Sequence, residues 1–111
     1  MASYLYLFRG GDMRSMSPQQ MQENMDRWRA WIGELARKDV YKGGEPLASE
    51  GRQMVGSKQT ITDGPFGETK DIVGGYLIIT AANLDEATEL ARGCPIFQRN
   101  GSVEVREIRS M

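Results

Sequence analysis

Histidine is absent from this chain of 111 residues, and cysteine occurs once. Without histidine there is no Ser–His or Cys–His nucleophile pair and no histidine metal site. A single cysteine excludes an internal disulfide and a cysteine cluster for zinc or iron–sulfur, and a lone thiol fits a reducing cytoplasm. We therefore expect a cytoplasmic protein that holds no metal and no other cofactor.

An excess of either charge and a long apolar run are also lacking. Fourteen Lys and Arg stand against fifteen Asp and Glu, a formal net charge of −1. This balance argues against direct nucleic-acid binding, which usually needs a basic surface. No apolar segment approaches the roughly 20 residues of a membrane span. The length is typical of one domain, so we expect a single domain over residues 1–111.

Two strongly apolar segments are present. Residues 4–8 alternate aromatic side chains with leucines, and residues 76–80 form a second apolar run. Aromatic and β-branched residues favour strands, and apolar side chains on both faces indicate buried strands. In residues 102–108, Val103 and Val105 alternate with charged residues. This pattern predicts a strand with one dry and one wet face.

Two helices are predicted between these strands. The first covers residues 17–38, with Ser17 as N-cap and Gln20 completing a capping box. Its expected apolar face consists of Met21, Met25, Trp28, Ile32 and Leu35. The second helix is predicted to begin after the N-cap Asn83 and to end before Pro95. Cys94, at that end, is expected to be a buried structural thiol, because a helix C-terminus disfavours a thiolate.

The middle of the chain is interrupted by glycine and proline. Residues 42–46 predict a loop, and residues 62–67 predict a turn. Between them, residues 54–55 and 59–61 indicate two short strands or a hairpin.

The order strand, helix, strand, strand, helix, strand is the βαββαβ pattern of an α+β ferredoxin-like fold. In that antiparallel sheet the first and third strands are central, which suits residues 4–8 and 76–80. The broken segment 54–61 and the charged segment 102–108 suit the edges. Both helices would cover one face of the sheet. The other face needs cover, so we predict a homodimer that packs through the sheet face.

The segment 62–70 reads Thr-Asp-Gly-Pro-Phe-Gly-Glu-Thr-Lys, and Gly74-Gly75-Tyr76 and Cys94-Pro95 follow it. With these motifs the chain resembles the YCII-related, or DGPF-domain, family over nearly its whole length. The resemblance implies a dimeric α+β barrel of ferredoxin-like subunits, in agreement with the predicted fold. It also implies a bacterial protein of largely uncharacterised function. Some relatives are associated with extracytoplasmic-function sigma factors, so it implies a sigma factor as a partner in transcription initiation.

Asp63 is the candidate catalytic residue. The resemblance implies the acidic member of a His–Asp pair, but this chain has no histidine to complete the pair. Asp63 would act alone as an acid–base group, or Asp-Gly would simply form a tight turn. Glu68 and Lys70 lie two residues apart and would share one face of an extended segment. They are candidate ligand-binding residues, or else a solvated edge.

Tyr6 is the third candidate ligand-binding residue. Its hydroxyl would line a pocket between the sheet and the helices, or its ring would belong to the core or to the dimer packing. Arg9, Arg106 and Arg109 would bind an anionic group or be ordinary surface charges.

Three functions stay open on the sequence. The first is a small-molecule-binding dimer with weak acid–base activity. The second is an accessory partner of a sigma factor, and the third is a structural dimer without a ligand.

Overall fold

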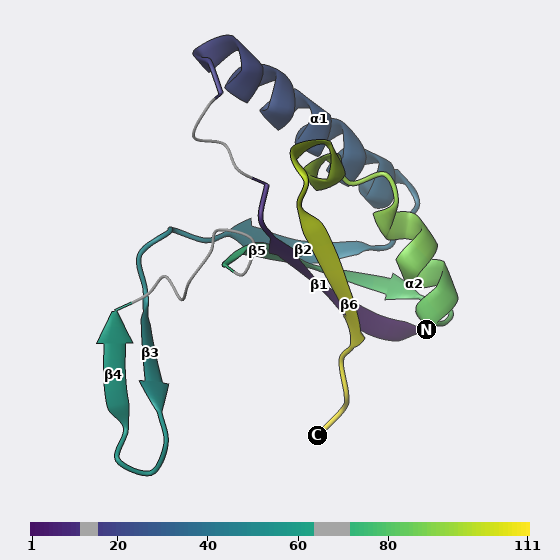
Figure 1. The fold of residues 1–111 in the computed structure, drawn as a ribbon. Helices are drawn as coiled ribbons and strands as arrows, with labels where there is room; N and C mark the ends of the chain where they lie inside the picture. The colour runs from purple at the N-terminus through teal and green to yellow at the C-terminus, as the bar shows by residue number, and fades with distance from the viewer. Residues whose placement is uncertain (12–15, 64–71) are drawn as a thin grey trace.

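Within residues 1–11, 16–63 and 72–111, which the structure describes, a four-stranded antiparallel sheet carries two helices on one face (Figure 1). The structure is a computed structural model. The sheet has the order β2-β5-β1-β6, formed by β1 (Ala2–Arg9), β2 (Tyr41–Pro46), β5 (Val73–Ala81) and β6 (Ser102–Glu107). The remaining elements are α1 (Pro18–Arg37), α2 (Leu84–Ala91), the 3₁₀ helix η2 (Pro95–Arg99), β3 (Arg52–Val55) and β4 (Thr60–Asp63).

The predicted ferredoxin-like arrangement is confirmed. The two apolar segments form the central strands β1 and β5, which pair antiparallel with Tyr6 opposite Leu77. On its other side β1 pairs with β6, where Tyr6 lies opposite Val105. As predicted, the strands that are apolar on both faces are the central ones, each paired with a neighbour on both sides.

The second edge strand differs from the prediction. The loop expected at residues 42–46 is wrong, because these residues form most of β2 and pair with β5. Gly44 is required there, since a Cβ at this position would lie 2.3 Å from the carbonyl oxygen of Tyr76. The hairpin expected within residues 54–61 is confirmed as β3 and β4. It forms a sheet of its own, so the prediction that this segment is an edge of the main sheet is wrong.

Both helix starts follow the sequence signals. Ser17 Oγ accepts a hydrogen bond from the backbone N–H of Gln20 at 3.1 Å, and Gln20 Oε1 accepts one from the N–H of Ser17 at 2.9 Å. This capping box satisfies backbone donors that the first helical turn leaves unpaired. Asn83 caps α2 by accepting from the N–H of Glu86 at 2.8 Å.

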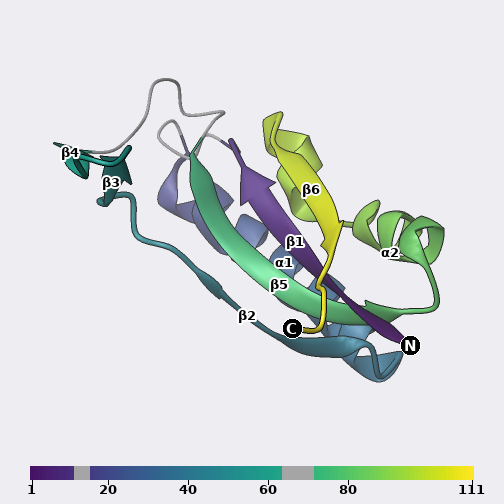
Figure 2. The ribbon, with the colours of Figure 1, turned by 90° about the horizontal axis from the view of Figure 1, so that it is seen from below.

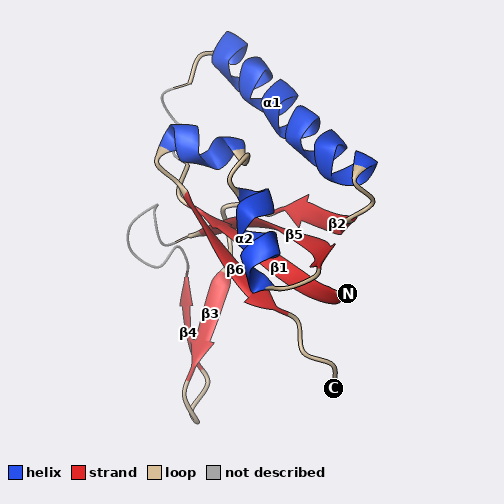
Figure 3. Ribbon diagram, turned by 90° about the vertical axis from the view of Figure 1, so that its right-hand side faces the viewer, coloured by secondary structure: helices blue, strands red, loops and turns tan. Residues whose placement is uncertain are grey.

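The buried face of α1 is rotated and shortened relative to the predicted face. Met21 and Met25 are exposed, at 44% and 48%, whereas Trp31 and Leu35 are buried. Both methionines belong to the N-terminal half of α1, which extends beyond the strands (Figure 3). The expected apolar face is therefore right for the C-terminal half of the helix and wrong for the N-terminal half.

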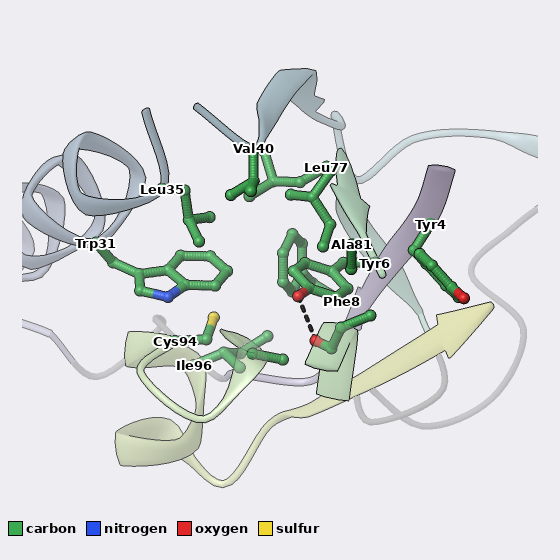
Figure 4. Packing of buried hydrophobic residues seen from close by; sticks show 13 residues of the cluster. Tyr4, Tyr6, Phe8, Trp31, Leu35, Val40, Leu77, Ala81, Cys94 and Ile96 are labelled. Atoms are coloured by element: carbon green, nitrogen blue, oxygen red, sulfur yellow. Dashed lines mark hydrogen bonds between the residues drawn. The ribbon is translucent and has the colours of Figure 1, made fainter. Parts of the chain in front are cut away.

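The core lies between the sheet and the helices, and aromatic rings fill its centre (Figure 4). The ring of Trp31 stacks on that of Tyr6 with centroids 6.1 Å apart, and it meets Phe8 edge-on at 6.2 Å. Trp28 meets Phe8 edge-on at 5.1 Å. Such ring pairs contribute about 0.5–1.5 kcal/mol each beyond the burial of their area. No helix in the described segments is both long and apolar enough to cross a membrane.

Candidate functional site

Tyr6 is placed in the core. Its side chain is 0% exposed, and its hydroxyl donates a hydrogen bond to the carbonyl oxygen of Ala87 at 2.5 Å (Figure 4). Burial raises the pKa of Tyr6 well above its ordinary value, so the hydroxyl stays protonated. The core alternative that the sequence left open describes this position, and the ligand-binding role of Tyr6 stays a prediction.

Asp63 is placed at the end of β4, on the projecting hairpin. Its side chain is 88% exposed and lies 3.5 Å from the guanidinium of Arg52 on the paired strand. Together with Glu50 and Gly51 these two residues border a shallow depression that is open to solvent. In the single chain Asp63 is thus an exposed, ion-paired carboxylate, whereas Tyr6 is buried. Its catalytic role stays a prediction.

Glu68 and Lys70 lie outside the described residues, as does most of the turn at residues 62–67. Their predicted ligand-binding roles therefore stay predictions.

The second face of the main sheet, away from the helices, is the other candidate site (Figure 2). Strand alternation places the side chains of this open face opposite those of the core. Two rows cross the central strands: Ile78 lies opposite Leu5 and Tyr76 lies opposite Leu7. These four apolar side chains are half-buried. We define the open face by Leu5, Leu7, Tyr76, Ile78, Glu104 and Arg106.

A charged cluster borders the open face at β6. Glu104 lies opposite Leu7 and Arg106 lies opposite Leu5. Arg9 Nη1 donates to Glu104 Oε1 at 2.5 Å, and Arg106 Nη1 lies 3.6 Å from Glu104 Oε2. Two guanidinium groups therefore share one carboxylate at the β6 border. At the β2 border Glu45, opposite Tyr76, adds a second carboxylate to the same face.

Cys94 is buried at the start of η2, as predicted for a structural thiol. Desolvation raises the pKa of the Cys94 thiol to about 12, so the thiolate needed for nucleophilic chemistry is not formed near neutral pH. In the part of the chain that the structure describes, no three Asp, Glu or Cys side chains gather to hold a metal ion.

The cluster around Glu104 was the feature that the sequence did not single out. The alternation in residues 102–108 predicts a wet face there, which is correct. The contact with Arg9 joins residues 95 positions apart, so it depends on the pairing of β1 with β6. No local pattern contains that information.

A solved structure similar to this chain is that of 5-chloro-2-hydroxyhydroquinone dehydrochlorinase (TftG) from Burkholderia phenoliruptrix AC1100, in complex with 2,5-dihydroxybenzoquinone. The TM-score is 0.56 and the identity 19%, over 98% of this chain and 95% of that one. At this identity the likeness shows a shared fold.

A curated relative is an uncharacterized protein of Rhizobium meliloti (strain 1021), 43% identical over 49 residues. The match covers 43% of this chain and spans 40% of the length of that relative. The model of the YCII-related domain matches residues 17–111, which is most of the chain. The chain therefore belongs to the YCII-related domain family.

Proposed function

We propose that this protein binds a small organic molecule on the open face, as a homodimer whose second copy closes the site. The observation that carries the proposal is the apolar floor of β1 and β5 beside the cluster of Arg9, Glu104 and Arg106. Binding sites for small molecules combine mainly apolar walls with a few polar groups that orient the ligand. The space between the sheet and the helices is less suitable, because the rings of Phe8 and Trp31 already fill it.

The exposed guanidinium of Arg106 favours a ligand with an anionic group. Arg106 is 69% exposed and only loosely paired with Glu104, so its guanidinium has donors to spare. Arginine binds carboxylates and related planar anions through two parallel hydrogen bonds. The half-buried Tyr76 and Ile78 would contact the apolar body of such a ligand.

We propose Asp63 as the acid–base group that would catalyse a slow reaction of the bound molecule. Its carboxylate is exposed in the single chain and is free of the core, unlike the hydroxyl of Tyr6. A general acid or base must reach the proton that it transfers. Asp63 can do so only where the hairpin that carries it lies next to the ligand on the open face.

The dehydrochlorinase whose structure is similar to this chain suggests a first molecule to test for binding. Its structure contains 2,5-dihydroxybenzoquinone, a flat molecule with acidic hydroxyl groups. We do not transfer its substrate to this chain, because the likeness is one of fold. No feature of the described residues and none of these comparisons favours a sigma factor as the partner.

Binding of 2,5-dihydroxybenzoquinone, benzoate and salicylate should be measured by titration calorimetry and by the melting temperature. A ligand at one hundred times its dissociation constant adds about 2.7 kcal/mol, which raises the melting temperature by roughly 10 °C. We expect Arg106→Gln to lose most of this rise. Asp63→Asn should keep the binding and lose any turnover of the bound molecule.

Arg92→Gln is the matched control, since Arg92, the C-cap residue of α2, is also exposed and paired with a glutamate, at 2.8 Å from Glu89. It should leave the effect of each probe unchanged. A wild-type protein that none of the three probes stabilises, or an equal response in both arginine variants, would contradict a site on the open face.

A further inference from the structure

The β3–β4 hairpin is the most exposed part of the described chain. All eight residues of its two strands are exposed, and the main sheet and helices do not cover it. Figures 1 and 3 show the hairpin projecting on the side of the sheet away from the helices. A molecule that covers the open face from that side would therefore lie next to the hairpin.

The hairpin has two different faces. Met54 pairs with Ile61, and Arg52 pairs with Asp63, so these four side chains share one face. Met54 is 59% exposed and Ile61 is 57% exposed, although both are large and apolar. The other face consists of Gln53, Val55, Thr60 and Thr62. The first face, which we call the Met54–Ile61 face, carries two large apolar side chains next to the ion pair of Arg52 and Asp63.

A hairpin of this kind needs support. Two strands alone are marginally stable in water, and at least a third strand or a packed face is required for independent stability. Its own chain supplies neither within the described residues, yet the strands pair in full register from Arg52 to Val55. A molecule packed on one face of the hairpin would supply this support.

The exposed area fits a second copy of the chain. The chain exposes 7993 Å², whereas a compact monomer of its mass would expose about 6,100 Å². The excess of about 1,900 Å² is more than the ~800 Å² that each partner buries in a standard stable interface. The radius of gyration is likewise 15.4 Å, against about 13 Å for a compact chain of this length.

We infer that the β3–β4 hairpin is an arm that clasps a second copy of this chain. Its Met54–Ile61 face lies on that copy and carries Asp63 into the interface. The inference rests on the homodimer of the proposed function and deepens it, because Asp63 then belongs to a site that one chain alone does not complete. In a two-fold symmetric dimer the same contact is made twice. The hairpin of each chain then packs on the main sheet of the other chain.

The arm is tested by the oligomeric state, measured by sedimentation over a range of protein concentrations. The wild type should sediment with twice the 12.4 kDa mass of one chain. Ile61→Glu should raise the dissociation constant of the dimer about 100-fold or more, since it places a charge in an apolar contact. Val55→Glu is the matched control: Val55 is 51% exposed on the other face of the same hairpin, and the dimer should persist.

A second measurement does not depend on a variant. Hydrogen exchange of the wild type should show that the amides of residues 53–62 become slower to exchange as the protein concentration rises. Hydrogen exchange that does not depend on protein concentration would contradict the role of the hairpin in the dimer. The same holds if Ile61→Glu leaves the dissociation constant of the dimer unchanged, or if Val55→Glu raises it as much as Ile61→Glu does. An Ile61→Glu dimer as tight as the wild type leaves the sheet-face dimer standing. A monomeric wild type overturns both. The Arg106→Gln titration, which uses a residue off the hairpin, reports on the proposed site separately.

Discussion

Trp31→Ala is expected to lower the free energy of unfolding by about 3–5 kcal/mol, the usual cost of removing a buried tryptophan. Trp31 is 8% exposed and contacts three other rings, those of Tyr6, Phe8 and Trp28. Its indole N–H also donates to the carbonyl oxygen of Leu90 at 3.2 Å, so it joins α1 to α2. Domains of this size are stable by only about 5–15 kcal/mol, so the substitution would remove a large share of the stability.

Urea unfolding followed by circular dichroism measures this loss. Met25→Ala is the control on the same helix, because Met25 is 48% exposed and should change stability by less than about 0.5 kcal/mol. If Trp31→Ala cost no more than Met25→Ala, the aromatic cluster would not be the centre of the core.

Alkaline pH is expected to remove up to roughly 4 kcal/mol of stability through Cys94 alone, at 1.36 kcal/mol for each pH unit of the shift. Burial raises the pKa of this thiol from 9.0 to about 12 in the folded chain. The folded state thus holds the proton more tightly than the unfolded state. The stabilisation is fully present below about pH 9 and is lost as the pH rises toward 12. The raised pKa of Tyr6 acts in the same direction at still higher pH.

The free energy of unfolding should therefore be measured in urea at pH 7, 9, 10 and 11. Cys94→Ala is the informative variant, since every other titrating group is shared with the wild type. It should be less stable at pH 7, because it leaves a small cavity, and its stability should fall less steeply above pH 9. Parallel curves for the two proteins would show that the thiol is not buried in the folded chain.

The elements that the sequence predicted well are those whose signal is local. The alternation of residues 4–8 and the cap at Ser17 depend on neighbours a few positions away, and both are found as expected. β2 was missed because residues 42–46 have little strand propensity. They form a strand since β5 offers an unpaired edge and Gly44 permits a close approach. The exposure of Met25 has a similar cause, because helical periodicity does not reveal where the sheet ends.

The candidate site was less predictable for the same reason. The sequence pointed to Asp63 through a motif, but the position of its hairpin depends on strand pairing and, in our inference, on a second chain. The open face was expected to need cover, and its apolar floor follows from the pattern of residues 4–8 and 76–80. Its charged border does not, because Arg9 and Glu104 meet only after the first and last strands have paired.

The pairing of β1 with β6 brings the two ends of this chain side by side. Tyr4 lies opposite Glu107, and the N–H of Ile108 donates to the carbonyl oxygen of Ser3 at 2.8 Å. A short glycine-rich linker could join the ends, and the chain could be reopened at the turn of residues 56–59. In this circular permutant β6 and β1 would be consecutive strands. Their pairing would then be a local contact, which should form faster than in the natural chain, whereas β3 and β4 would pair between the two new ends.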